Sequence, residues 1–596
     1  MLGWCGGAAT TPAIVPGPLP TERRNSAIRP TGAETDDLRA VLDDPLVLEH
    51  RDDADALVAG LPPASFVRVA RQLRDEGRLE LLLPRATPDQ LVTLLDLDVW
   101  RGDRVDVGRA RQWLLAIGEC SVAADRPRGA LVDLIHAMDP ELWTLALFAD
   151  TNIITLDLED DASRDEALDQ LAHLRTWETP DGFFIVGTPD DEAGRAVLRV
   201  LSRVYDDDLG YGRRLVLSIV AALPSEIEET LLRFRSGRLA DLGFVEWQDA
   251  TLLLRPLDHK VAATAVPRDF RWLGGDDAGA AMTVFRGSEL LRRATARLPD
   301  AEHGLRAREF LLLVNEVIAA QRLPPGDDAV GERAIDQTTA TLGLGLELLL
   351  QSRPGDPEPE VFLAERITAI GLRDVFRVGY GALDKLRRAA IALHRAMRVS
   401  TTHVGSLLDR PWGQALAALC RLYPELPLES TGSSTRPIRS LVDVARATER
   451  IAEAGALAAL TYLPAGYGVD PSWIDRVDEP EKLTLGDLLR SAIVHSRLPG
   501  SRSTFAPLTP ADLSWAHANL LSGGVLDDAV RRDFSARCDA LGLGRYTNAL
   551  ADVVLARLRV ELLGLELDGD VPDLARTGGL VTLQSVSMWM TVEGKN

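Results

Sequence analysis

The sequence predicts a mainly α-helical protein, with a helical-repeat N-terminal half, one small β insertion and a helical C-terminal half. Short proline-containing signals in the N-terminal part each read as the first turn of a helix. Aromatic residues make up only 5% of the chain, and leucine and alanine fill most apolar positions. Leucine and alanine are strong helix formers, whereas strands favour β-branched and aromatic side chains.

Three helix starts organise the N-terminal half, and each is marked by a proline: Pro63, Pro88 and Pro140. Proline is tolerated at the first helical position because the N–H that it lacks would have no partner there. Thr87, with Gln90 three residues later, also fits a capping box. After each proline, apolar residues stand at the third, sixth and seventh positions, which places one apolar stripe on each helix. These residues are Phe66, Val69, Ala70, Leu91, Leu94, Leu95, Trp143, Ala146 and Leu147.

The length of 596 residues is too great for one core and predicts about three or four domains. Residues 1–35 are rich in Gly, Pro, Thr and Ala and lack apolar periodicity, so we expect a disordered tail there. We expect a helical-repeat domain with the strand insertion over 36–265, a middle helical domain over 266–475 and a C-terminal helical domain over 476–596.

Two short segments are the clearest strand candidates. Residues 152–158 and 183–187 are rich in Ile, Thr, Phe and Val and are bounded by Asp, Pro and Gly. They predict a two-stranded insertion in the helical body. Residues 580–592 alternate weakly between apolar and polar and are a candidate terminal strand.

The charge and the cysteine content argue against nucleic acids and membranes as partners and against an oxidising compartment. The chain carries 66 basic and 89 acidic residues, a net charge of −23, which repels phosphate backbones and anionic lipids. The four cysteines lie far apart, as expected in a reducing cytoplasm. No stretch approaches the roughly 18 uninterrupted apolar residues of a membrane span. We therefore expect a soluble cytoplasmic protein that binds neither nucleic acid nor membranes.

Aspartates after the second helix start are the candidate metal ligands. Asp96, Asp98 and Asp103 offer hard oxygen ligands of the kind that Mg²⁺ and Ca²⁺ prefer. An EF-hand loop that begins at Asp96 would require glycine and glutamate where the chain has Arg101 and Val107. The alternative to a metal site is a capped turn.

The segment RFRSGRLADLGF is the most unusual local sequence in the chain. Its arginines, Arg233, Arg235 and Arg238, together with Asp241, are candidate binding residues for an anion or a carboxylate. The alternative is a helix C-terminus closed by Gly237, where cations offset the helix dipole.

Common catalytic motifs are absent from the sequence. No P-loop, dinucleotide-binding glycine motif, GxSxG elbow or HExxH motif occurs, so no cofactor is predicted. Residues 491–504 gather hydroxyls, His495 and two arginines that could hold a phosphate. His495 is expected to close a helix, however, where the dipole repels anions.

Four segments resemble a bacterial family of unknown function. They are LPPASF (61–66) and the segments at 86–103, 233–244 and 377–390. The resemblance covers most of the chain after the tail and implies a shared fold but no activity. The proline-initiated helices also resemble the cytoplasmic helical domain of MgtE-type magnesium transporters and parts of flagellar motor switch proteins, which implies a superhelical surface used in regulation or assembly.

The leading functional hypothesis is a non-enzymatic scaffold or regulatory protein that presents a helical surface to a protein partner. The alternative is a divalent-cation sensor or metal-dependent enzyme. Its site would combine Asp96, Asp98 and Asp103 with the segment 233–241.

Overall fold

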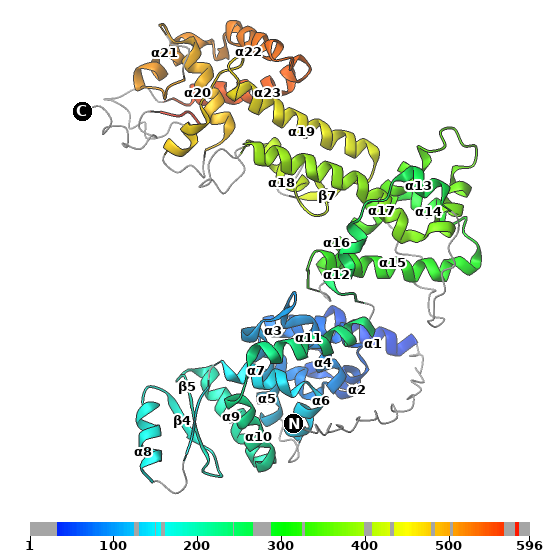
Figure 1. Cartoon of the computed structure of the whole chain (residues 1–596), viewed down its shortest axis with the longest axis vertical. Coiled ribbons are helices and arrows are strands. Elements are labelled where there is room, and N and C mark those ends of the chain that lie inside the picture. The colour runs from blue at the N-terminus through cyan, green and yellow to red at the C-terminus, as the bar shows by residue number, and fades with distance from the viewer. Residues whose placement is uncertain are drawn as a thin grey trace, which may run out of the picture. The chain divides into compact units, whose positions relative to one another are not determined.

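The computed structural model of the chain divides into two compact units (Figure 1). The first unit comprises residues 1–94, 112–140 and 150–217, and the second comprises 95–111, 141–149 and 218–596. The structure describes residues 32–123, 130–149, 151–156, 161–241, 244–265, 288–324, 328–397, 408–428, 434–477, 483–500, 505–565 and 579–582. The expected tail therefore lies outside the described residues, except for its last four, which begin the first helix.

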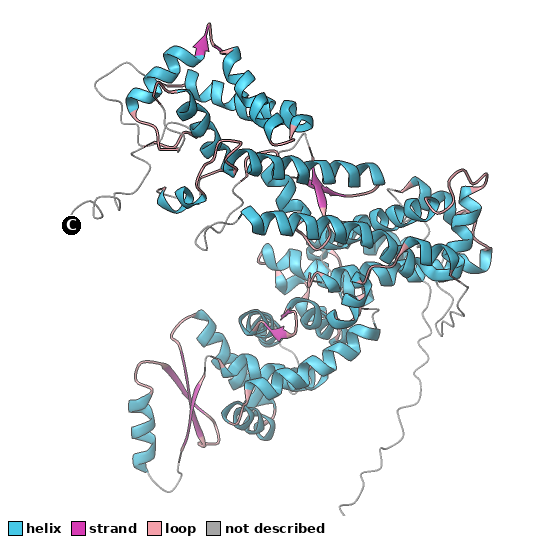
Figure 2. Ribbon diagram, turned by 45° about the horizontal axis from the view of Figure 1, so that its top comes forward, coloured by secondary structure: helices cyan, strands magenta, loops and turns pink. Residues whose placement is uncertain are grey.

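Helices dominate both units, which confirms the mainly α prediction (Figure 2). The helices up to residue 241 are α1 (Gly32–Asp43), α2 (Ala54–Gly60), α3 (Pro63–Asp75), α4 (Pro88–Asp98), α5 (Val107–Ala123), α6 (Ala130–Ala137), α7 (Pro140–Phe148), α8 (Asp161–Gln170), α9 (Glu192–Asp207), α10 (Leu209–Val220) and α11 (Pro224–Asp241). The later helices are α12 (Trp247–Ala250), α13 (His259–Thr264), α14 (Glu289–Thr295), α15 (Asp300–Ala320), α16 (Asp328–Leu350), α17 (Pro359–Met397), α18 (Trp412–Leu419), α19 (Leu441–Tyr462), α20 (Leu485–Arg497), α21 (Pro510–Leu520), α22 (Asp528–Ala540) and α23 (Thr547–Leu563). Among the described helices, none is both long and apolar enough to cross a membrane.

The three proline-marked helix starts are confirmed. Helices α3, α4 and α7 begin at Pro63, Pro88 and Pro140. The Thr87 hydroxyl accepts the Gln90 N–H at 3.3 Å, and the Gln90 side chain accepts the Thr87 N–H at 2.9 Å, which completes the capping box. All nine stripe residues are buried, with exposed fractions of at most 3%. The arrangement of these helices as a solenoid-like repeat stays a prediction.

The β insertion has three described strands instead of the expected two. Strands β3 (Asn152–Thr155) and β5 (Phe184–Thr188) match the two predicted segments, and β4 (Arg175–Glu178) pairs antiparallel with β5, so that the order is β3-β5-β4. Strand β4 escaped prediction because its ends are charged and its four residues give too short an alternation. Of the predicted terminal strand, only residues 580–582 are described, and Thr582 bridges to Leu508.

Among the described residues, one order of elements occurs twice: a helix, a tight hairpin and a second helix. In the first module, α4 leads through β1 (Trp100–Arg101) and β2 (Arg104–Val105) into α5. In the second module, α21 leads through β8 (Leu521–Ser522) and β9 (Val525–Leu526) into α22. Each hairpin is closed at its base by a backbone hydrogen bond, from Asp106 N to Val99 O at 2.8 Å and from Asp527 N to Leu520 O at 2.9 Å. The same aspartates then accept an N–H of the following helix.

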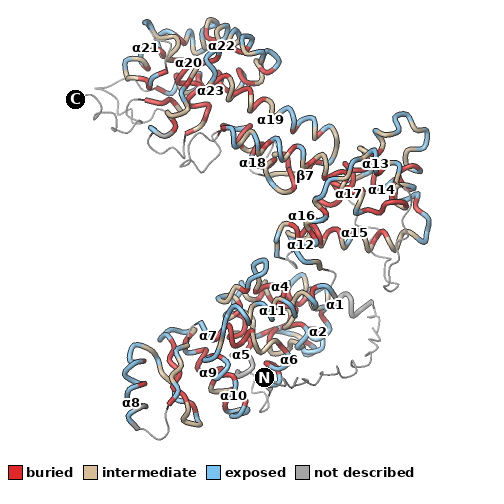
Figure 3. The backbone as a smooth tube through the Cα atoms, in the orientation of Figure 1, coloured by how far each residue is buried: buried red, intermediate tan, exposed pale blue. Residues whose placement is uncertain are grey.

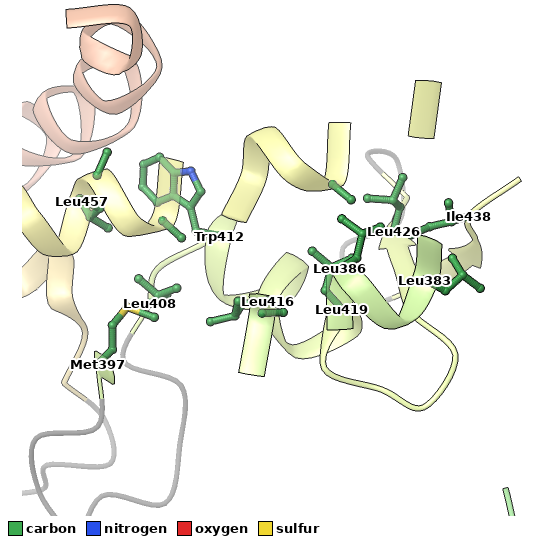
Figure 4. Close-up of a cluster of buried hydrophobic side chains, with 14 of the residues drawn as sticks. Leu383, Leu386, Met397, Leu408, Trp412, Leu416, Leu419, Leu426, Ile438 and Leu457 are labelled. Carbon is green, nitrogen blue, oxygen red and sulfur yellow. The ribbon is translucent and has the colours of Figure 1, made fainter. Parts of the chain in front are cut away.

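A single hydrophobic core runs through residues 253–581 of the second unit (Figure 3). Helices α16 and α17 pack backbone to backbone within it, because a Cβ at Gly345 would lie 2.2 Å from the Val375 carbonyl oxygen and one at Gly379 only 2.0 Å from that of Thr341. Side chains of α17, α18 and α19, Trp412 among them, gather in one part of this core (Figure 4). The small sheet β6 (Glu425–Pro427) and β7 (Thr435–Pro437) lies beside α18. The core includes residues on both sides of the predicted boundary at 475/476, and the division into three domains stays a prediction.

Candidate functional site

The structure brings one candidate aspartate, Asp96 in the last turn of α4, together with two arginines of α11. Arg238 donates from Nε and Nη2 to the two carboxylate oxygens of Asp96, and each donor–acceptor distance is 2.7 Å. Asp96 is buried, with 4% of its surface exposed, whereas the Arg238 side chain keeps 32%. This two-pronged geometry is the strongest form of an arginine–carboxylate contact. It joins residues 142 positions apart in the sequence.

Arg235 approaches the same place from one turn earlier in α11. Its Nε donates to the backbone oxygen of Asp96 at 2.8 Å, and its guanidinium lies 4.9 Å from the ring centre of Trp100 in β1. Burial lowers the pKa of Arg235 to about 10, although the negative charge of Asp96 acts in the opposite direction. The side chain therefore remains a cation at neutral pH. Arg235, Arg238, Asp96 and Trp100 form what we call the first charge cluster.

The remaining predicted site residues lie elsewhere. Asp98 is buried and accepts from Arg109 Nε at 2.8 Å, while Asp103 is exposed in the β1–β2 turn. Arg233 is exposed on the opposite face of α11, and the Asp241 side chain lies outside the described residues. A metal ion at Asp96 or Asp98 would have to displace an arginine. Among the described residues, no group of three or more His, Cys, Asp or Glu side chains is arranged to hold a metal ion.

Gly237 does not end α11, contrary to the alternative drawn from the sequence. The helix continues to Asp241, and a Cβ at Gly237 would meet open space. A glycine inside a helix costs only about 1 kcal/mol relative to alanine. The buried contacts of Arg235 and Arg238 on both sides of Gly237 outweigh that cost, which a local sequence rule cannot anticipate.

A second charge cluster was missed by the sequence reasoning. Arg490 of α20 is 2% exposed and donates to Asp487 through Nη2 and to Glu561 of α23 through Nε at 2.9 Å. Asp409 lies 3.9 Å from Arg490 Nη1 and accepts from Arg557 Nη1 at 2.6 Å. These three carboxylates and two arginines form what we call the second charge cluster. Burial raises the pKa of both Asp487 and Glu561, against the opposing charge of Arg490.

Two glycines and a C-terminal segment enclose the second charge cluster. A Cβ at Gly486 would lie 1.8 Å from Asp409 Oδ2, and one at Gly579 would lie 2.1 Å from Asp487 Oδ1. The Val581 N–H donates to the Ser491 hydroxyl at 2.8 Å, and that hydroxyl donates to the Asp487 carbonyl oxygen at 2.6 Å. The Thr484–Asp487 capping box and the Asp487–Arg490 pair three residues apart on α20 could have been recognised locally, whereas Asp409 and Glu561 come from distant segments.

A third group of buried charges supports a break in α17. Gly371 has a φ of +79°, which interrupts the helix. Arg306 of α15 donates to the Thr368 carbonyl oxygen at 3.2 Å, and Glu309 accepts the Arg373 N–H at 3.0 Å, so one carbonyl and one N–H beside the break gain side-chain partners. The buried Glu316, also on α15, binds Arg373 Nη2 at 3.2 Å. Burial raises the pKa of Glu316 to about 7.

An apolar patch is exposed beside the hairpin of the second module. Val525 of β9 is 59% exposed, and Val560 and Leu563, one turn apart on α23, are 67% and 46% exposed. Arg559 Nε donates to the Gly524 carbonyl oxygen at 2.6 Å and holds the hairpin against α23. We call Val525, Val560 and Leu563 the apolar patch.

A protein-family model described as "Family of unknown function (DUF6178)" matches residues 45–582. No curated protein and no solved structure matches the chain. The resemblance to MgtE-type transporters and motor switch proteins therefore gains no support from these comparisons.

Proposed function

The chain belongs to this family of unknown function, DUF6178, and from its own residues we propose that it is a non-enzymatic scaffold or regulatory protein that binds a protein partner. The observation that carries the proposal is the apolar patch. Exposed apolar side chains gathered on fixed elements are typical of protein interaction sites. Here two regular elements, β9 and α23, present them and a hydrogen bond from Arg559 ties the elements together.

The candidate site residues support a structural role over a reactive one. Both carboxylate oxygens of Asp96 are occupied by Arg238, and Asp98 is bound by Arg109. A carboxylate engaged in this way is a poor general base, because its lone pairs already accept hydrogen bonds from a permanent cation. The first charge cluster therefore fastens α11 to the end of α4.

The chemistry of the surface indicates the kind of partner. Asp527 and Asp528 are exposed next to Val525, and the whole chain has a net charge of −23. We propose a protein partner that inserts apolar side chains at the patch and carries basic residues around them. The proposed setting is the cytoplasm, because Cys420 and Cys538 are free thiols.

Affinity capture with matched variants tests this proposal. We compare the wild-type chain with Val560→Asp in the patch and with Val442→Asp, which changes a valine that is 65% exposed on α19. A partner identified with the wild type and with Val442→Asp, and then purified, should bind Val560→Asp at least about tenfold more weakly, a difference of about 1.4 kcal/mol. Equal affinity for all three proteins would remove the patch from the proposal, and the absence of any reproducible partner would remove the scaffold role.

A further inference from the structure

Helix α11 has two opposite faces of different character. On one face, Leu231 and Leu239 are buried. The same face carries Arg235 and Arg238, which bind Asp96 in the first charge cluster. The other face is exposed and includes Phe234, 50% exposed, while Leu223 at the N-terminal end of the helix is 57% exposed. Helix α11 is thus anchored on one side and open on the other.

The residues at the edge of the open face follow a seven-residue pattern. Ile227, Thr230, Phe234 and Gly237 of α11 are separated by three, four and three positions, and Leu223, directly before the helix, stands four positions before Ile227. This spacing aligns side chains in one seam along a helix and is the pattern by which two helices interlock. Thr230 and Gly237 are exposed, Ile227 is half-buried, and a Cβ at Gly237 would meet open space.

Opposite charges lie along one edge of this seam. Glu226 and Arg233 are both exposed and are seven residues apart, so they occupy equivalent positions on the same edge. When two identical helices pair in opposite directions, each edge meets the same edge of the second helix in reverse order. Glu226 then faces Arg233 of the second copy, and Arg233 faces its Glu226.

We propose that α11 pairs antiparallel with α11 of a second copy of this chain about a two-fold axis. Leu223 packs against Phe234 of the second copy, Ile227 packs against its Thr230, and two Glu226–Arg233 ion pairs flank the seam. One patch serves both copies, as two-fold symmetry requires. The inference goes beyond the proposed function, because its occupant is the chain itself and its surface is a different helix from the apolar patch.

The size of the contact sets the expected strength. Helix α11 has 18 residues and is about 27 Å long, so a single helix pair buries less than the roughly 1,200 Å² of a standard stable interface. The pairing is therefore reversible, with a dissociation constant on the order of micromolar. Salt weakens it, because the two flanking ion pairs are exposed.

A charge-swap series measured by analytical ultracentrifugation tests the pairing. The purified full-length wild type should dimerise reversibly between about 1 and 100 µM, the range that brackets a micromolar dissociation constant. Glu226→Arg places two arginines on each edge and Arg233→Glu places two glutamates there, so each variant alone should self-associate at least about tenfold more weakly. An equimolar mixture of the two variants should dimerise again, because the arginine edge of one meets the glutamate edge of the other. The double variant Glu226→Arg/Arg233→Glu should also dimerise.

The equimolar mixture is the decisive experiment. Dimerisation of the mixture, but of neither variant alone, is expected only if the two edges pair in opposite directions. A wild type that stays monomeric at 100 µM, single variants that dimerise like the wild type, or a mixture that stays monomeric would each overturn the proposal. Phe234→Asp should abolish dimerisation, and Val442→Asp should leave it unchanged. Circular dichroism of every variant should match the wild type, because both charged side chains are exposed. The capture of another protein has no bearing on these outcomes.

Discussion

The two charge clusters both combine arginines with carboxylates, but arginines are in excess in the first and carboxylates in the second. In the first, one buried carboxylate, Asp96, is approached by two arginines of α11. In the second, one buried arginine, Arg490, is approached by three carboxylates, with Arg557 at the rim. The Arg238 side chain is 32% exposed, whereas the Arg490 side chain is 2% exposed. Water can therefore screen the first cluster, but only neighbouring charges can stabilise Arg490.

Because of this difference, the two clusters should respond differently to the loss of an arginine. Loss of an arginine from the first cluster leaves one negative charge near water. Loss of Arg490 leaves two or three negative charges enclosed, because Asp409 and Asp487 are 4% and 6% exposed. The second cluster should therefore respond more strongly both to mutation and to pH.

The largest expected effect is that of Arg490→Met. This change leaves Asp487 and Glu561 buried without their cation, and it should lower the free energy of opening of α20 and α23 by about 3–5 kcal/mol. Hydrogen exchange of the amides in these two helices measures that loss. The control is Arg292→Met, which breaks an exposed pair with Glu289 and should leave the protection of α20 and α23 unchanged. Similar losses for the two variants would contradict the enclosed character of Arg490.

Arg238→Met should have the next largest effect. It removes both hydrogen bonds from the Asp96 carboxylate and should reduce hydrogen-exchange protection of α11 by about 2–3 kcal/mol, less than Arg490→Met because water can reach this site. Glu229→Gln, on the exposed face of the same helix and outside the seam, is the matched control and should change protection by less than about 0.5 kcal/mol. The double variant Arg238→Met/Asp96→Leu should recover part of the loss, since no carboxylate is left buried without its cation, while Arg235 keeps its hydrogen bond to the backbone oxygen of residue 96. No recovery would show that packing, and not charge, fixes α11.

The pH dependence of the second cluster gives a smaller effect. The pKa of Glu561 in the folded chain is raised above its ordinary value of 4.5, so the folded chain holds this proton more tightly than the unfolded chain. Ionisation of Glu561 therefore lowers the free energy of unfolding as the pH rises from 4.5 through the folded pKa. The loss is about 1.4 kcal/mol for each unit by which the pKa is shifted. Glu561→Gln should flatten the decline in α20 and α23 protection as the pH rises above 4.5. The exposed control, Glu229→Gln, should leave the slope unchanged, and parallel curves for wild type and Glu561→Gln would argue against a raised pKa.

The smallest effect should come from Trp100→Leu in the first cluster. Leucine keeps most of the apolar contact but loses the aromatic face beside Arg235, a loss of about 0.5–1 kcal/mol. Trp100→Phe should lose less, because a smaller aromatic face remains. Both changes can be followed as hydrogen-exchange protection of α11. Equal effects of leucine and phenylalanine would mean that the indole acts only through its volume.

Much of the local structure was predictable because its causes lie within a few residues. Pro63, Pro88 and Pro140 begin helices as expected, and Thr87 caps α4 through its hydroxyl. The candidate site was predicted in part, since its two segments were identified and the structure joins them through Asp96 and Arg238. The partner of each aspartate was not predictable, because several arginines are equivalent in sequence.

The sequence by itself determined the helices, the β3–β5 pairing segments and the buried stripes, because capping and periodicity act over one or two turns of chain. The tertiary structure alone decided that α11 continues past Gly237, that β4 completes the small sheet, and that Arg490 meets Glu561 71 residues away. The physical reason is the range of each interaction. A cap or a stripe is fixed by neighbours in sequence, whereas a buried ion pair is stable only where folding has removed water from both partners at once.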